Sequence, residues 1–287
     1  ADYGLMSEDT LETVIRKSLA QAQGSCTFGF QGGEPTLRGL PFFQKAMALQ
    51  KQYKPDGLTV MNAIQTNGLL IDDAWAEFFR EHRFLVGLSV DGTSKIHNQN
   101  RVDADGNGTL RRAMEAARRL KAHRVEFNLL TVVTNDTAER VDRIFDFFMR
   151  QGLVWQQYIP CLDAWNRTET WLEPKQYGKF LIGLFDLWAR EVLAGRFLYI
   201  RQFENYVGML LGKPAESCDM TGQCARQYVV EADGSVFPCD FYCMDGYRLG
   251  NLTTDSFEEL DRRREATGFV QASLEIDEQC RACEYYS

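Results

Sequence analysis

The feature that most constrains the fold is a regular alternation of helical and β-rich segments between residues 7 and 133. The helical segments carry apolar residues with a period near 3.6, and the short segments between them are β-rich. This alternation is typical of βα units and a parallel sheet, so we expect an α/β fold. The expected strands are 26–31, 59–65, 84–90, 126–133 and 155–159, and the expected helices are 7–23 with Ser7 as N-cap, 40–54, 72–82, 109–121, 138–150 and 174–194.

The five expected strands share polar or glycine-rich carboxyl ends. These ends read FQGGEP, IQTNG, LSVDG, VVTN and YIPCLD. Loops after strands are commonly polar without binding anything, so a single ending carries little weight. Ligands of parallel α/β sheets and barrels bind at this edge, however, and five such endings together predict a pocket there.

Composition excludes several functional classes. The 287 residues are 45% hydrophobic and carry a net charge of −8 without a basic stripe, which argues against a nucleic-acid partner. No apolar run is long enough to cross a bilayer, and the first residues do not resemble a signal peptide. We therefore expect a cytoplasmic protein that binds neither nucleic acid nor membrane.

The cysteines are concentrated near the C-terminus. Clustered thiols in a chain of this size without an export signal are more typical of metal ligands than of disulfides. Only Cys26 and Cys161 lie in the first two thirds, whereas the last seventy residues hold Cys218, Cys224, Cys239, Cys243, Cys280 and Cys283.

Two groups of these cysteines have the spacing of metal sites. Residues 227–231 and 235–237 read as a hairpin with a turn at 232–234, and a helix is expected at 256–266. Cysteines on both sides of the hairpin can reach one centre, and the C-x-x-C pair near the end can grip one metal. Iron–sulfur is the favoured interpretation and zinc the alternative, because neither group supplies four ligands and the three histidines lie far upstream. Cys243 is either a ligand or a buried thiol.

Several motifs together resemble one known family. FGFQGGEPTL, QTNG, FLVGLSVDG, HNQNR and GSVFPCDFY…RLGN closely resemble the anaerobic sulfatase-maturating enzymes, which are radical S-adenosylmethionine (SAM) proteins with a C-terminal SPASM domain. GGEP alone indicates only the superfamily, whereas the Cys–Asp–Phe–Tyr string is more specific to sulfatase maturation. The resemblance implies a partial (β/α)6 radical SAM barrel over residues 1–205 and a truncated SPASM domain with auxiliary iron–sulfur clusters over residues 206–287.

The resemblance also implies a SAM site. Gly33 matches a contact to the methionine amino group, and Glu34 beside it is a candidate acceptor for this ammonium. Ser89 matches a SAM-contacting serine, and Arg101 matches the arginine that binds the SAM carboxylate. Leu162 matches an apolar contact to the adenine. The alternatives are a surface salt bridge for Arg101, a strand-end cap for Ser89 and a core position for Leu162.

The same resemblance assigns the substrate side and the metal ligands. Gln31 is expected to face the substrate, and Asp240 matches the catalytic base that takes the thiol or hydroxyl proton. The alternative for Asp240 is a turn-capping residue. Ligands of the first auxiliary [4Fe–4S] cluster match Cys218, Cys224 and Cys239, and ligands of the second match Cys280 and Cys283.

The implied activity is that of a radical SAM oxidoreductase working anaerobically. SAM is cleaved to a 5′-deoxyadenosyl radical, and a Cys or Ser in a sulfatase C/S-x-P-x-R motif is oxidised to Cα-formylglycine. The complete protein is expected to hold about three [4Fe–4S] clusters. Its expected partners are an unfolded sulfatase polypeptide or peptide and an electron donor such as flavodoxin or ferredoxin. The sequence leaves open the substrate residue, the donor and the oligomeric state.

The sequence departs from the family pattern at both ends. The C-x-x-x-C-x-x-C motif is absent, and the cysteines expected beyond the C-x-x-C pair are missing. A fragment explains both gaps at once, and this chain alone is then expected to be inactive. Two alternative functions are another SPASM peptide maturase that forms thioether or carbon–carbon crosslinks, and a non-catalytic metal-binding homologue.

Overall fold

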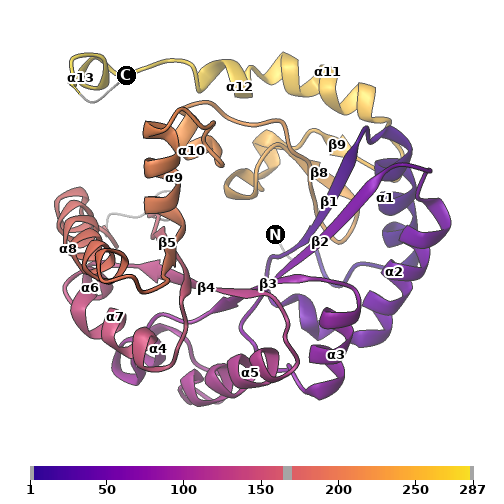
Figure 1. Cartoon of the computed structure of the whole chain (residues 1–287). Helices are drawn as coiled ribbons and strands as arrows, with labels where there is room; N and C mark the ends of the chain where they lie inside the picture. The colour runs from indigo at the N-terminus through magenta and orange to yellow at the C-terminus, as the bar shows by residue number, and fades with distance from the viewer. Residues whose placement is uncertain (1–2, 164–169, 285–287) are drawn as a thin grey trace. The chain divides into compact units, whose positions relative to one another are not determined.

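The computed structural model describes residues 3–163 and 170–284 and confirms the alternation of strands and helices (Figure 1). The strands are β1 (Ser25–Phe30), β2 (Thr59–Thr66), β3 (Leu85–Ser89), β4 (Phe127–Val133), β5 (Trp155–Pro160), β6 (Tyr199–Ile200), β7 (Val229–Val230), β8 (Ser235–Phe237) and β9 (Gly250–Asn251). The helices are α1 (Glu8–Gln21), α2 (Leu40–Tyr53), α3 (Asp73–Glu81), α4 (Ser94–Asn100), α5 (Leu110–Ala122), α6 (Asn135–Ala138), α7 (Val141–Arg150), α8 (Pro174–Leu193), α9 (Arg201–Leu210), α10 (Cys218–Thr221), α11 (Phe257–Thr267), α12 (Phe269–Ala272) and α13 (Glu278–Arg281).

The first six strands form one sheet in sequential order, from β1 to β6. The pairs from β2–β3 to β5–β6 are parallel, so the carboxyl ends of these strands meet at one edge, as a partial (β/α)6 barrel requires. The prediction of five strands was wrong in number. β6 has only two residues, which pair with Trp155 and Gln156, and so short a strand has no detectable alternation in the sequence.

Local side-chain caps explain where several helices begin. The predicted N-cap Ser7 accepts a hydrogen bond from the backbone N–H of Thr10 at 3.1 Å, and Asp72 caps α3 in the same way. The predicted helix 138–150 is in fact two helices, because Thr134 caps the short α6 and Arg140 leaves the helical backbone conformation before α7. The helix α4 was not predicted.

The chain divides into two compact units that interleave along the sequence. We call residues 27–37 and 61–210 the barrel unit, and residues 1–26, 38–60 and 211–287 the cysteine unit. The predicted domain boundary near residue 205 stays a prediction. In the barrel unit, helices α3, α5 and α7 lie outside β3, β4 and β5 (Figure 1). Its core is apolar and includes the fully buried Val86, Leu88, Leu129, Phe79 and Phe148.

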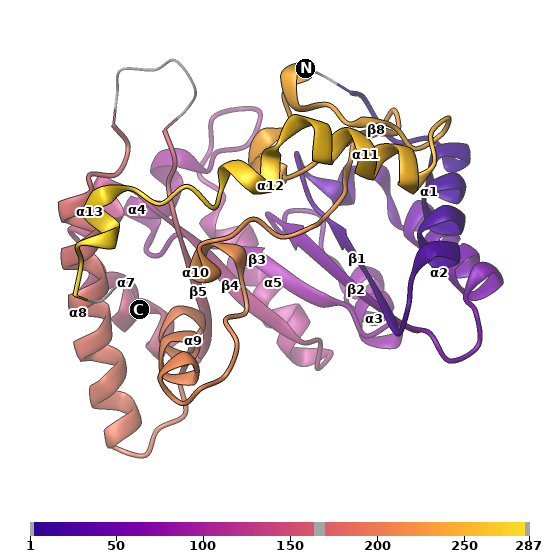
Figure 2. The same cartoon turned by 90° about the horizontal axis from the view of Figure 1, so that it is seen from above.

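The cysteine unit is built on the predicted hairpin. β7 and β8 are antiparallel, with Val229 opposite Phe237, and β9 adds a third strand. A small core of Val236, Leu249, Leu252, Phe257 and Leu260 lies beside this sheet, and Val14 of α1 packs against it. Helices α1 and α2 of the same unit lie side by side (Figure 2). The hairpin that carries Cys239 is therefore fixed by a core of its own.

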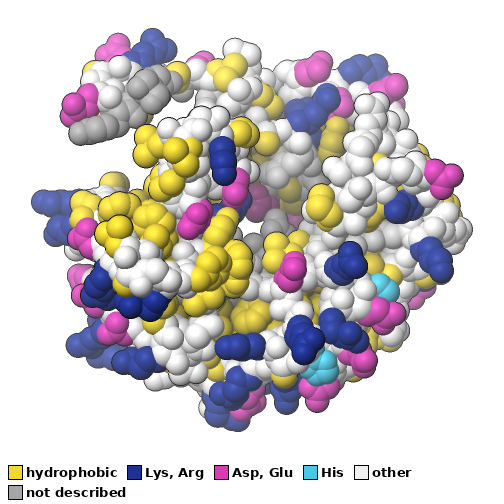
Figure 3. All heavy atoms as spheres, in the orientation of Figure 1, with side chains coloured by type: hydrophobic (Ala, Val, Ile, Leu, Met, Phe, Trp, Pro, Cys, Tyr) yellow, Lys and Arg dark blue, Asp and Glu magenta, His cyan; other side chains and the backbone are white. Residues whose placement is uncertain are grey.

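Part of the barrel unit's surface is apolar. Hydrophobic side chains gather over α8 and α9 (Figure 3), and exposed examples are Ile182, Leu193 and Leu210. Within residues 3–163 and 170–284, no helix combines the length and the apolar character needed to span a membrane.

Candidate functional site

The loop after β1 has a backbone that only glycine adopts easily. Gly32 has φ +86° and Gly33 has φ +51°, both in the left-handed region. A Cβ at either residue would meet no atom within 4 Å, so conformation and not crowding requires glycine here. The open space beside this backbone leaves room for a ligand to approach closely.

Glu34 connects this loop to the end of β2. Its Oε1 accepts hydrogen bonds from the Thr36 backbone N–H at 3.0 Å, the Thr36 hydroxyl at 2.5 Å and the Thr66 hydroxyl at 2.9 Å. Its Oε2 accepts one from the backbone N–H of Asn67 at 2.7 Å. Both threonines are buried. The carboxylate is therefore occupied by four donors of the chain, and its predicted contact to the SAM ammonium stays a prediction.

Arg101 forms a two-point ion pair with Asp91. Its Nε lies 2.5 Å from Asp91 Oδ2, and its Nη2 lies 3.1 Å from Asp91 Oδ1. Asp91 is only 6% exposed, and its Oδ1 also accepts the backbone N–H of Val132 at 2.9 Å. Asp91 is buried and Arg101 is half-buried, so this pair differs from the surface salt bridge considered from the sequence.

A buried histidine extends this network and was not predicted from the sequence. His97 Nδ1 accepts the backbone N–H of Asp91 at 3.1 Å, and its Nε2 lies 3.1 Å from the Thr109 hydroxyl. That hydroxyl donates to the carbonyl of Arg101 at 2.9 Å. Burial lowers the pKa of His97 to about 4, so the ring is neutral at pH 7 and its acceptor Nδ1 assigns the proton to Nε2. The only signal in the sequence was the position of His97 in HNQNR.

The remaining predicted residues of this site lie at or beyond strand ends. Ser89 is the last residue of β3 and is half-buried, whereas Gln31 directly follows β1 and is exposed. Leu162 follows β5 and is 60% exposed, so the alternative of a core position for it was wrong. Their contacts to SAM and substrate stay predictions.

A polar cavity of about 220 Å³ lies at the carboxyl end of β4. Its wall includes Thr134, Asn135, Asp136 and Trp171, and Gln99 donates to Asp136 across it at 2.7 Å. Of the five polar strand endings, VVTN contributes to the wall of this hollow, so a pocket shared by all five stays a prediction. Sequence reasoning singled out this ending but not Asp136 or Gln99.

All eight cysteines lie within the described ranges, and each is a free thiol there. Cys239 Sγ lies 3.4 Å from Asp240 Oδ1, and burial raises the pKa of the Cys239 thiol. The backbone N–H of Cys283 bonds to the carbonyl of Cys280 at 3.1 Å, so this pair lies on one turn. Asp240 is exposed.

The donor chemistry of these thiols fits an iron–sulfur cluster, because soft thiolates are its usual ligands. Within residues 3–163 and 170–284, however, no three His, Cys, Asp or Glu side chains converge on a metal position. The thiols are therefore the right type of ligand for an iron–sulfur cluster, but the described side chains are not close enough together to bind one. Burial and the nearby Glu231 raise the pKa of Cys243 to about 12. The choice between a ligand and a buried thiol for Cys243 stays as the sequence left it.

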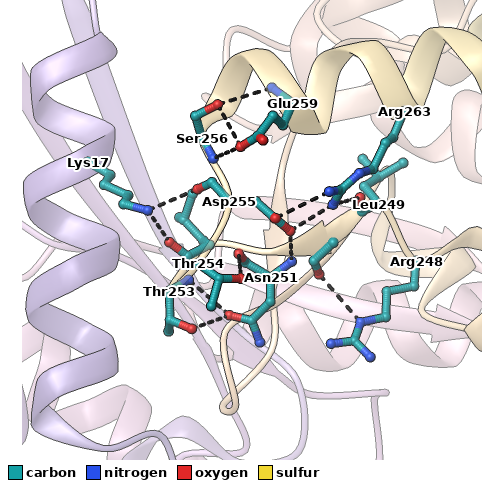
Figure 4. A network of polar contacts seen from close by, with 12 residues as sticks. Lys17, Arg248, Leu249, Asn251, Thr253, Thr254, Asp255, Ser256, Glu259 and Arg263 are labelled. Atoms are coloured by element: carbon teal, nitrogen blue, oxygen red, sulfur yellow. Dashed lines mark hydrogen bonds and ion pairs between the residues drawn. The ribbon is translucent and has the colours of Figure 1, made fainter.

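A polar network stabilises the loop beside the hairpin (Figure 4). Asp255 accepts the backbone N–H of Asn251 at 2.8 Å and an N–H of Arg263 at 2.7 Å. Lys17 donates to the carbonyls of residues 252 and 255 at 2.7 and 2.9 Å. The Asn251 amide donates to the carbonyl of Asp233 in the hairpin turn at 2.9 Å. Residues 251–255 thus couple α1, β9 and the turn that leads into β8.

Comparisons with known proteins agree with this architecture. Residues 2–148 match the radical SAM superfamily, and residues 218–284 match SPASM, an iron–sulfur cluster-binding domain. The cysteine-type anaerobic sulfatase-maturating enzyme of Clostridium novyi (strain NT) is 41% identical over 99% of this chain and 77% of its own length. The serine-type enzyme of Klebsiella aerogenes is 36% identical over 86% of this chain and 62% of its own. The solved structure of native anSMEcpe with bound AdoMet and Kp18Cys peptide has a TM-score of 0.94 and 43% identity, over 99% of this chain and 80% of that one.

Proposed function

The chain belongs to the anaerobic sulfatase-maturating enzymes of the radical SAM superfamily, and we propose from this that it oxidises the cysteine of a sulfatase C-x-P-x-R motif to Cα-formylglycine. The observation that carries this proposal is 41% identity over 99% of the chain to a cysteine-type enzyme. The serine-type relative matches a smaller share of the chain at 36% identity. A maturase that crosslinks peptides has no comparable support.

SAM and [4Fe–4S] clusters are the cofactors of this family, and when bound they supply the one-electron steps that oxidise the substrate's β-carbon. In the barrel unit, the open backbone at Gly33 suits the SAM ammonium, and Arg101 suits the carboxylate because three of its five N–H donors are left beyond the Asp91 pair. Ser89 and Leu162 would contact the rest of SAM, and Glu34 would hold the glycine loop.

In the cysteine unit, Asp240 would accept the proton of the substrate thiol. Its carboxylate is exposed and therefore accessible to a peptide. The cluster ligands would be Cys218, Cys224, Cys239, Cys280 and Cys283. Gln31 of the barrel unit would contact the substrate peptide, which reaches the enzyme as an unfolded sulfatase segment. An electron donor such as flavodoxin or ferredoxin would supply electrons.

The test is anaerobic turnover by the full-length protein reconstituted with iron and sulfide. Peptides with a C-x-P-x-R or an S-x-P-x-R motif are supplied with SAM, and formylglycine and 5′-deoxyadenosine are measured. We expect faster formylglycine formation from the cysteine peptide. An Asp240→Asn variant should lose formylglycine formation, whereas the control Asp219→Asn should keep it.

Two results would contradict the proposal. Preference for the serine peptide would overturn the cysteine-type assignment while keeping the family. Formylglycine formation by Asp240→Asn at the rate of Asp219→Asn would remove Asp240 from the mechanism.

A further inference from the structure

We propose that Asp91 is a positioning residue for Arg101: it holds one edge of the guanidinium so that the remaining donors stay directed to the carboxylate of SAM. The proposal rests on the proposed function, because it takes SAM as the ligand. Neither the sequence motifs nor the family resemblance pointed to Asp91, although it follows Ser89 by two residues in the SVDG string.

The donors of Arg101 divide into two sets. A guanidinium has five N–H groups in a planar fork, and a carboxylate is bound best by two of them in parallel. Asp91 takes Nε–H at 2.5 Å and one N–H of Nη2 at 3.1 Å. Among residues 3–163 and 170–284, the second N–H of Nη2 and both N–H groups of Nη1 have no hydrogen-bond partner. These groups form another edge of the same fork, which can bind a second carboxylate end-on.

Asp91 is suited to hold the arginine because it is itself fixed at two points. Its Oδ1 accepts the backbone N–H of Val132 in β4 at 2.9 Å. Its own backbone N–H donates to the buried His97 at 3.1 Å. The side chain of Asp91 is 8% exposed and that of Arg101 is 25% exposed, so water reaches the arginine more readily than its partner. Asp91 thus links the guanidinium of Arg101 to strand β4 through hydrogen bonds within the chain.

Thr109 restrains the backbone of Arg101 from the other side. Its hydroxyl donates to the Arg101 carbonyl at 2.9 Å, and its backbone N–H donates to the same carbonyl at 3.2 Å. His97 Nε2 lies 3.1 Å from that hydroxyl and links it back to the Asp91 backbone. Backbone and side chain of Arg101 are therefore both held before any ligand binds, which reduces the ordering cost of binding.

Asp91 does not increase SAM affinity electrostatically. Because it is an anion paired with Arg101, it weakens the electrostatic attraction between the guanidinium and a second carboxylate. Any gain in SAM affinity must come from orientation. Freeing one long side chain to reorient should weaken binding by about threefold to tenfold, and the loss should be confined to ligands that carry the carboxylate.

The experiment uses two ligands that differ only in this group, SAM and decarboxylated SAM. Dissociation constants are measured by calorimetry under anaerobic conditions for the reconstituted full-length protein and for Asp91→Asn, with the exposed Asp105→Asn as matched control. We expect Asp91→Asn to weaken SAM by about threefold to tenfold and to leave decarboxylated SAM unchanged. In the Arg101→Ala background, Asp91→Asn should have no further effect on SAM.

Equal weakening of both ligands by Asp91→Asn, or additive effects of the two substitutions, would overturn the proposal. If Asp91→Asn does not fold, Arg101→Lys replaces it, since lysine cannot be held at two points by Asp91. It should reduce discrimination between the two ligands, and unchanged discrimination would also overturn the proposal. Failure of the proposed function is seen separately, as absence of formylglycine in the peptide assay, and does not alter the ligand comparison.

Discussion

Replacing Glu34 with glutamine should destabilise the protein by about 3 kcal/mol, because it weakens the hydrogen bonds that join the loop after β1 to the end of β2. The carboxylate accepts four hydrogen bonds at 2.5 to 3.0 Å, two of them from backbone N–H groups. Hydrogen bonds to a charged acceptor contribute about 1.5–3 kcal/mol each and neutral ones about 0.5–1.5 kcal/mol. Glutamine keeps one acceptor oxygen and turns an N–H2 group toward the other donors, so at least one donor loses its partner. One unsatisfied buried donor costs about 1–3 kcal/mol.

The assay is urea and thermal unfolding of Glu34→Gln against a matched control. Glu115→Gln is the same substitution in the same unit, and Glu115 pairs with the exposed Arg111 at 2.8 Å. A surface i,i+4 pair of this kind is worth about 0.3–0.5 kcal/mol. For a chain of this size, 3 kcal/mol corresponds to a fall in melting temperature of about 6–12 °C, and the control should move by about 1 °C. Hydrogen exchange in residues 30–38 should accelerate only in Glu34→Gln.

Equal unfolding midpoints for the two variants would refute this reasoning. If Glu34→Gln unfolds like the control and yet loses SAM binding, Glu34 is an acceptor for the SAM ammonium, as the sequence motif predicted. If Glu34→Gln has a lower unfolding midpoint, and its affinities for SAM and decarboxylated SAM fall by the same factor, the carboxylate acts by holding the glycine loop.

Three further predictions concern stability. Burial lowers the pKa of His97 to about 4, whereas an unfolded imidazole binds its proton near pH 6.5. The free energy of unfolding should therefore fall by on the order of 3 kcal/mol as the pH is lowered from 6.5 to 4. In His97→Gln, the urea unfolding midpoint should decrease less over the same pH range. Gly250 has φ +153°, which side chains rarely adopt, and a Cβ there would also displace the ion-paired ends of Arg263 and Asp255. Gly250→Ala should therefore cost about 2 kcal/mol in thermal unfolding, whereas Gly246→Ala, with open space at its Cβ, should cost clearly less. Lys17→Met removes hydrogen bonds to two carbonyls and should cost about 1–2 kcal/mol, while the exposed Lys51→Met should unfold like the unaltered protein.

The sequence predicted helices and strands that are long enough to show a regular spacing of apolar residues. Helix α7 has Ile144, Phe145 and Phe148 on one buried face, and the sequence shows that spacing directly. The two-residue strands β6 and β9 are too short for any alternation, and pairing partners far along the chain define them. The break between α6 and α7 was missed for a related reason. It lies at Arg140, whose backbone is not helical, and the amino-acid composition around an arginine does not indicate such a change.

The sequence predicted which strand ends form the candidate site, but it did not predict which residues hydrogen-bond to each other there. Glu34 bonds to Thr66 and Asn67, more than thirty residues away, and Asp91 bonds to Val132, forty-one residues away. Such bonds depend on which strands are neighbours in the sheet, and a local pattern does not contain that information.

These partners divide the motif residues into two kinds with different chemistry. Gly33 and Arg101 have polar groups left over for a ligand, namely an open backbone and three N–H donors. Glu34 and Asp91 are carboxylates whose oxygens already accept hydrogen bonds from donors of the chain, so each would fix a residue that we propose to bind SAM. A negative charge beside a site for the zwitterionic end of SAM would otherwise repel its carboxylate. Hydrogen bonds from neighbouring donors to each carboxylate would reduce that repulsion and keep the orientation that the carboxylate provides, so two acidic residues are compatible with the proposed SAM site.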